Sequence, residues 1–119
     1  MDERLAKRLV PDGLWEIVAP LVPPPKMRPQ GGGRRPVEDR AVFTAIVYVL
    51  TTGCAWRHLP PTFGVSKATV HRRFTAWTED GLWRKLHVAV LDNLGERGEI
   101  DWSRAVVDAA SLRAKGGAI

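Results

Sequence analysis

The feature that most constrains the fold is the nearly continuous apolar run within residues 38–52. As a helix, this segment has little polar face, so other elements must surround it. Glu38 and Asp39 suit the positive end of the helix dipole, and Gly53 suits a C-terminal cap. The sequence therefore predicts a mainly α-helical protein built around a buried helix at 38–52.

Two more helices are predicted on either side of this central one. The first covers about residues 12–22, where apolar residues recur at helical spacing, and the prolines from Pro23 onward stop it. The other covers about residues 80–94, with a second apolar stripe and Gly95 as its end signal. We expect the stripe at 80–94 to pack on the central helix.

A further helix is predicted to begin after Ser66, whose hydroxyl can cap the first turn. Val70, Phe74 and Trp77 recur at i, i+4 and i+7, so they define its buried face. Before it, residues 55–64 have room for one short helical turn and a tight connection. A short helix, a tight connection and a second helix make a helix-turn-helix, which we predict at about residues 55–77.

The outer face of the helix after Ser66 is small and basic. At about 100° per residue, the side chains opposite its apolar stripe point to solvent. The second helix of a helix-turn-helix enters a major groove, where Arg72 can fork onto a guanine and Lys67 or Arg73 can hold phosphate. The residues predicted to bind DNA are Arg57, in the short segment before this helix, and, on the helix itself, Lys67, Ala68, Thr69, His71, Arg72, Arg73 and Thr75. The alternative is a surface helix with ordinary solvated charges.

The middle of the chain carries no acidic residue. The whole chain has 18 Lys and Arg against 13 Asp and Glu, a formal net charge of +5, which favours a polyanionic partner. Between Asp39 and Glu79 there is neither Asp nor Glu. This acid-free block contains the predicted recognition helix, and it favours double-stranded DNA over the solvated-charge alternative.

Residues 23–36 form a second basic segment. Its prolines favour extended chain, its three consecutive glycines make it loose, and its basic residues include Arg34 and Arg35. Such an arm can follow a phosphate backbone or place arginines in a minor groove. A solvated linker explains the composition equally well.

The sequence also argues against several classes of protein. Cys54 is the only cysteine, so the chain has no disulfide or zinc cluster of its own, and we interpret Cys54 as a buried structural thiol. The N-terminus lacks the apolar run of a signal peptide, and the longest apolar stretch is too short to cross a bilayer. We expect a cytoplasmic protein with no membrane partner.

The chain changes character near its C-terminus. Residues 104–114 are rich in small and β-branched residues, and we predict a strand at Ala105–Ala109. Asp108 would then lie among apolar residues, where a carboxylate often has a task such as binding a metal. No acidic residue follows Asp108, so it has no later carboxylate to share a metal with.

Four segments between residues 11 and 117 stand out together: LWEIVAPLVPPP, GGRRP, TVHRRFTAWTEDGLWRKL and DWSRAVVDAASLRAKGG. They resemble the N-terminal part of bacterial insertion-sequence transposases of the insertion-sequence-five branch, and the resemblance covers about residues 11–117. Its most specific stretch is TGCAWRHLPP, residues 52–61, a combination that a generic helix-turn-helix would not share.

The resemblance implies a helical DNA-binding domain at residues 1–100, followed by the start of a truncated ribonuclease-H-like catalytic domain at residues 101–119. In such transposases two Asp and one Glu hold two divalent metals, usually Mg²⁺, for phosphoryl transfer. Only the first Asp has a counterpart here, Asp108. We therefore expect no cofactor and no catalysis from this chain alone, and Mg²⁺ only in a complete enzyme.

Three functions fit these observations. The preferred one is the DNA-binding N-terminal portion of a transposase, which recognises the terminal repeats of its element alone or as a dimer. The second is an enzyme fragment that a downstream catalytic polypeptide complements. The third is a helix-turn-helix transcriptional regulator, which would have no use for Asp108.

Overall fold

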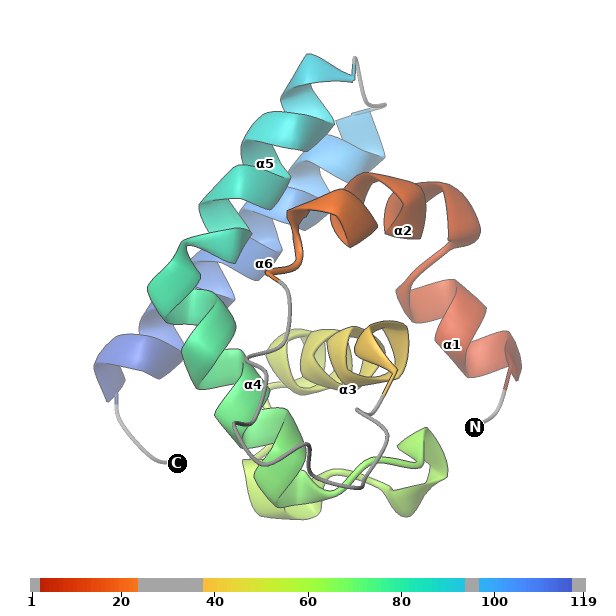
Figure 1. Ribbon diagram of the computed structural model, residues 1–119, viewed down its shortest axis with the longest axis vertical. Coiled ribbons are helices and arrows are strands. Elements are labelled where there is room, and N and C mark those ends of the chain that lie inside the picture. Colours follow the sequence, from red (N-terminus) through yellow and green to blue (C-terminus); the bar gives the residue numbers. More distant parts are fainter. Residues whose placement is uncertain (1–2, 24–37, 94–96, 117–119) are drawn as a thin grey trace, which may run out of the picture.

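The computed structural model describes residues 3–23, 38–93 and 97–116, and this part of the chain contains helices and no strand (Figure 1). The mainly α-helical class is therefore confirmed. In chain order the elements are α1 Glu3–Leu9, α2 Asp12–Val18, the 3₁₀ turn η1 Ala19–Leu21, α3 Asp39–Thr52, the 3₁₀ turns η2 Trp56–His58 and η3 Pro61–Phe63, α4 Lys67–Asp80, α5 Leu82–Asp92 and α6 Arg97–Gly116.

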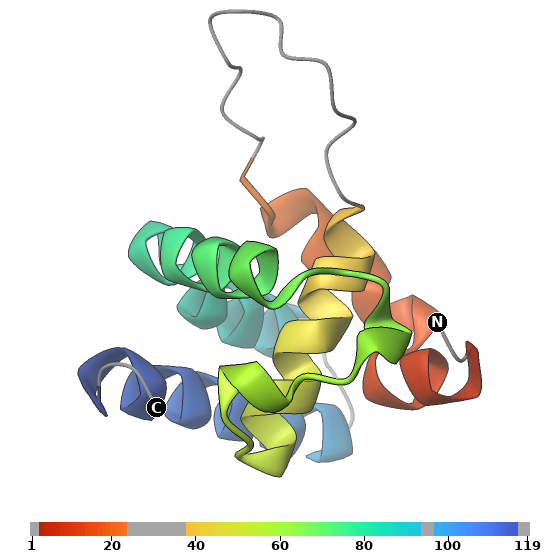
Figure 2. The same cartoon turned by 90° about the horizontal axis from the view of Figure 1, so that it is seen from below.

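The central helix is α3, as the apolar run predicted. Residues 42–47 are all buried, and the hydroxyl of Thr44 among them donates a hydrogen bond of 2.7 Å to the carbonyl of Arg40. Figure 2 shows α4, α6 and the α1–α2 pair arranged around α3. Gly53 ends the helix at φ 72°, and its N–H donates to the carbonyl of Val49.

The two flanking helices are also present. The helix predicted at 12–22 is α2 followed by η1, and it buries Leu14 and Val18. The helix predicted at 80–94 is α5, which buries Leu82, Trp83, Leu86 and Val90. Its predicted end signal, Gly95, lies outside the described residues.

α5 and α6 run side by side in opposite directions, and this pair covers one side of the molecule (Figure 1). Val106 and Ala110 of α6 are buried in the common core, and α6 also packs against α3 and α4. Between the two helices, His87 Nδ1 lies 2.7 Å from the Oγ of the fully buried Ser103. α6 therefore belongs to the same packed unit as α3 and α5, and it runs without a break through residue 100, where we predicted a domain boundary.

The strand predicted at Ala105–Ala109 is wrong for this structure, because these residues lie within α6. An isolated strand leaves its N–H and C=O groups unpaired, and no other strand is present in the described ranges to pair with it. A helix satisfies those groups internally, and its alanines favour it. The helical period was present in the sequence: Ser103, Val106 and Ala110 recur at i, i+3 and i+7 and are buried together.

Within the described residues, none of the helices is long and apolar enough to span a bilayer.

Candidate nucleic-acid interface

The candidate site begins at the N-terminus of α4, where the backbone is fixed by its neighbours in sequence. Gly64 adopts φ 70° and ends η3, so the chain turns before the helix starts. Ser66 then caps the helix: its Oγ accepts a hydrogen bond of 3.1 Å from the N–H of Thr69. The predicted cap is confirmed, and it places the first turn of α4 at the surface.

The structure turns one face of α4 to solvent. The buried face is Val70, Phe74 and Trp77, as the spacing predicted. Of the predicted DNA-binding residues on α4, Thr69 and Arg73 are half-buried, and the remaining ones are exposed, namely Lys67, Ala68, His71, Arg72 and Thr75.

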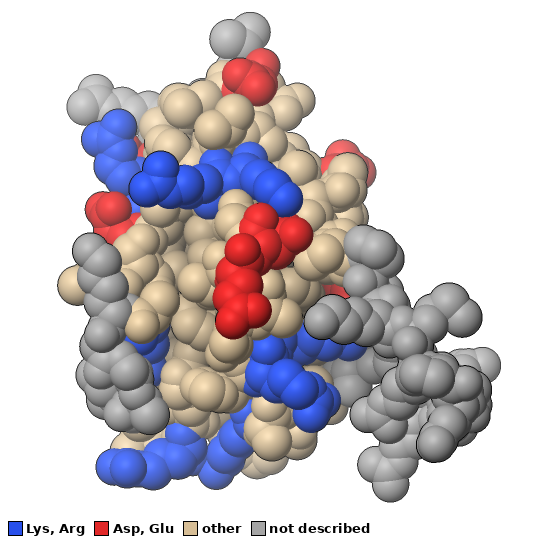
Figure 3. Space-filling model, turned by 60° about the vertical axis from the view of Figure 1, so that its left-hand side comes forward, with Lys and Arg blue, Asp and Glu red and all other residues tan. Residues whose placement is uncertain are grey.

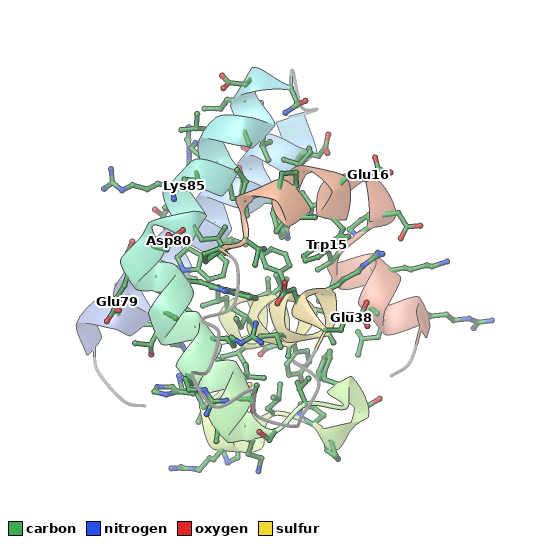
Figure 4. All side chains as sticks on the ribbon, viewed as in Figure 1. Trp15, Glu16, Glu38, Glu79, Asp80 and Lys85 are labelled. Carbon is green, nitrogen blue, oxygen red and sulfur yellow. The ribbon has the colours of Figure 1, made fainter. Side chains whose placement is uncertain are left out.

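The charges of α4 oppose its own helix dipole. No acidic residue lies in its first turn and no basic residue in its last turn. Acids stabilise helix N-termini and bases stabilise C-termini, whereas α4 begins with Lys67 and ends with Glu79 and Asp80. Figure 4 shows both acids at the α5 end of the helix, where Asp80 pairs with Lys85 at 3.0 Å. In Figure 3, Lys and Arg side chains lie both below the acidic side chains at the centre of this view and in a band directly above them.

Two neighbouring arginines of α4 have different surroundings. Arg72 is exposed. Arg73 is turned inward: its Nη1 donates a hydrogen bond of 2.7 Å to Asp39 at the start of α3, and its guanidinium carbon lies 6.0 Å from the centre of the Trp77 ring. The side chain of Arg73 is only 19% exposed, so this arginine joins α3 to α4 in the structure.

The turn η2 lies against the same part of α4. Trp56 is buried with its ring centre 5.0 Å from that of Phe74 and 5.5 Å from that of His71, the latter at an edge-on angle of 80°. The next two residues, Arg57 and His58, are exposed. The buried indole thus holds a second basic element, η2, beside the first half of α4. Two 3₁₀ turns, rather than an α-helix, precede α4.

Sequence reasoning missed Arg113, which approaches this region from α6. Its Nη2 donates a hydrogen bond of 2.6 Å to the carbonyl of Cys54, and its guanidinium carbon lies 5.3 Å from the centre of the Trp56 ring. Cys54 itself is half-buried with a free thiol. One signal could have found Arg113: it continues the inward row of Ser103, Val106 and Ala110 by three residues.

The remaining predicted site residues lie elsewhere. Arg34 and Arg35, in the basic segment 23–36, fall outside the described residues. Asp108 is exposed on α6, and no group of three side chains able to hold a metal occurs in the described ranges.

These features define the class of the protein: a small helical protein with an exposed basic helix start and turn on one face. Residues 10–87 match the family described as "Putative transposase of IS4/5 family (DUF4096)". The chain is also 45% identical over 114 residues to "Insertion element IS402 uncharacterized 16.2 kDa protein" of Burkholderia cepacia, across 94% of this chain and 78% of that protein. No solved structure matches. The chain belongs to the IS4/5 transposase family.

Proposed function

We propose that this chain is a DNA-binding portion of a transposase and that it recognises the terminal repeats of its element. The observation that carries the proposal is the exposed start of α4, which contains Lys67 and no acidic residue in its first turn. A cation in the first turn opposes the helix dipole and weakens the isolated helix, so its presence favours an external anion that binds there.

The geometry suits two kinds of contact. Lys67, at the first position of α4, and Arg57, on the adjoining turn, are exposed charges that can reach phosphates on the DNA backbone. Arg72 follows more than one turn later on the same helix, beside the small exposed Ala68 and Thr75. In this proposal α4 enters the major groove and Arg72 reads a base edge.

Arg73 is assigned differently, because it is already paired with Asp39 and partly buried. We infer that it fixes α4 on α3 and does not contact DNA. Two further roles belong to a complete enzyme: Mg²⁺ chemistry, in which Asp108 would be the first carboxylate, and complementation by a downstream catalytic polypeptide. A second copy of this chain would instead be a dimer partner on DNA. Among the described residues there is no group of three His, Cys, Asp or Glu side chains that could hold a metal.

The test is a binding titration of the purified chain against its terminal-repeat duplex and a scrambled duplex of equal length, each at two salt concentrations. Specific recognition predicts affinity for the repeat at least about a thousandfold above the scrambled duplex. Equal and salt-sensitive affinity for both would leave an electrostatic clamp without end recognition. Absence of binding to either duplex would refute the proposal.

The adjacent arginines provide a matched pair of variants for the same assay. Arg72→Ala should weaken repeat binding by about 1–3 kcal/mol and leave the melting temperature unchanged, if Arg72 reads a base. Arg73→Ala should instead lower the melting temperature, because it leaves Asp39 without its partner. An Arg72→Ala protein that loses stability but keeps its selectivity would reverse these assignments.

A further inference from the structure

The C-terminal helix α6 contacts the turn beside the candidate DNA-binding surface through the side chain of Arg113. This guanidinium lies over the Trp56 ring, and its Nη2 donates to the carbonyl of Cys54, 59 positions earlier in the chain. Cys54 lies two residues before η2, and Trp56 is the first residue of η2. Arg113 therefore contacts both the backbone that leads into this turn and the Trp56 ring.

The contact continues to the surface of α4. The Trp56 ring that carries Arg113 also meets the ring of His71 edge-on at 5.5 Å, and His71 is exposed on the basic face. Arg57 follows Trp56 directly in η2, so the packing of the indole bears on the backbone that carries Arg57. Arg113 is therefore placed to act on two exposed basic residues through one buried ring.

Arg113 itself is poorly placed to touch DNA. Its Nη1 is buried from solvent, and its Nη2 is used by the Cys54 carbonyl. Nη1 has no hydrogen-bond partner among the described residues, and a buried unsatisfied donor costs stability. A leucine at position 113 would fill the same space without leaving a buried N–H donor unsatisfied. The arginine is therefore better explained by its contacts with Cys54 and Trp56 than by packing alone.

We propose that Arg113 is a positioning residue of the DNA-binding surface: from α6 it holds Trp56, and through Trp56 it sets the positions of Arg57 and His71 against DNA. This inference rests on the proposed function, and it adds that the affinity for DNA depends on a helix that does not touch DNA.

The experiment compares Arg113→Gln, Arg113→Lys and the control Arg104→Gln, which changes an exposed arginine of the same helix. Arg113→Gln should lower the affinity for the terminal repeat about tenfold, within the usual range of coupling between sites. Because Arg113 acts through the position of Arg57, the losses of affinity in Arg57→Ala and Arg113→Gln should not add in the double variant. Arg113→Lys keeps the positive charge and an N–H donor but loses the planar guanidinium over the Trp56 ring. The affinity of this variant for the terminal repeat should therefore lie between those of Arg113→Gln and the parent.

NMR of the DNA-free protein tests the positioning directly. The indole N–H signal of Trp56 and the ring signals of His71 should shift in Arg113→Gln. The indole signal of Trp15, a ring of α2 that packs on Phe43, should stay in place. In Arg104→Gln none of these signals should move. A uniform change of all indole signals would mean general destabilisation and would overturn the proposal.

The outcomes separate the two levels of inference. A parent protein that binds neither duplex overturns the proposed function together with this consequence of it. A parent that binds, with an Arg113→Gln protein that binds equally well, overturns only the role of Arg113. Losses of affinity that add fully in the Arg57→Ala, Arg113→Gln double variant would make Arg113 a separate DNA contact instead.

Discussion

At the scale of single residues, charge partners decide which basic side chains are available to a ligand. Arg40 lies on α3, where its Nη2 donates to Asp12 at 2.5 Å and to the carbonyl of Val10 at 3.1 Å. Arg73 is likewise held by Asp39. These two arginines join helices, and the adjacent Arg72 is exposed. The sequence alone gives all three the same charge and does not distinguish their tasks.

The Asp12–Arg40 pair leads to a prediction about pH. The Arg40 guanidinium lowers the pKa of Asp12, first by its hydrogen bond and then by its charge. Because the folded pKa lies below the unfolded value, the pair stabilises the fold above that unfolded value, and the contribution is lost as the pH falls through the folded pKa. At neutral pH, the Asp12→Asn protein should therefore have its unfolding midpoint at a lower denaturant concentration than the parent. In strong acid the two midpoints should coincide.

Denaturant unfolding of both proteins at a series of pH values checks this expectation. Glu16→Gln is the matched control, since Glu16 is an exposed acid of the same helix (Figure 4). It should follow the parent at every pH. If the difference in unfolding midpoint between Asp12→Asn and the parent stays constant into strong acid, the stabilisation by Asp12 does not depend on its charge.

At the scale of elements, glycine at positive φ connects helices that point in different directions. Gly81 has φ 81° and ends α4 through hydrogen bonds to the carbonyls of Thr78 and Trp77. It is also the residue from which α5 starts. The angle between α4 and α5 therefore depends on one residue in a conformation that costs other residues about 1–2 kcal/mol.

Gly81→Ala should lower the free energy of unfolding by about 1–2 kcal/mol, since an alanine must adopt the left-handed conformation there. The cost is conformational, because an added Cβ would meet no atom within 4 Å. Gly13→Ala is the control: that site is helical and equally open, so alanine should stabilise by up to about 1 kcal/mol. Denaturant titration measures both, and two changes of the same sign would contradict this explanation.

At the scale of the whole molecule, α6 closes the core. Val106 and Ala110 are almost fully buried, and α6 packs along α5 and against α3 and α4. The predicted domain boundary at residue 100 implies that the residues before it fold without the rest of α6. Because α6 packs on α3, α4 and α5, removing it tests that boundary directly.

Removal of residues 97–119 should abolish or strongly weaken cooperative thermal unfolding and increase binding of a hydrophobic dye, because the core faces covered by α6 become exposed. Circular dichroism and dye fluorescence measure both effects. For a matched pair of substitutions, Val106→Ala should cost about 2 kcal/mol. Val88→Ala, at a side chain on α5 that is 54% exposed, should cost less than about 0.5 kcal/mol. A shortened chain that melts like the parent would support an independent domain at 1–100.

The sequence by itself determined the local features of this protein. The buried α3, the Ser66 cap, the glycine ends and the inward row of Val70, Phe74 and Trp77 follow from periodicity and from backbone preferences, which act over a few residues. The exposed basic face of α4 follows from the same periodicity.

Only the tertiary structure decided features that depend on partners far away in the chain. Residues 105–109 are helical because α6 has a core to pack on and no strand to pair with in the described part. Arg73 pairs with Asp39, which precedes it by 34 positions in the sequence but lies next to it in the fold. Arg113 reaches Trp56 because α6 runs back along α5 and packs against α4. Such contacts arise from the packing of whole helices, which the spacing of residues within one segment does not determine.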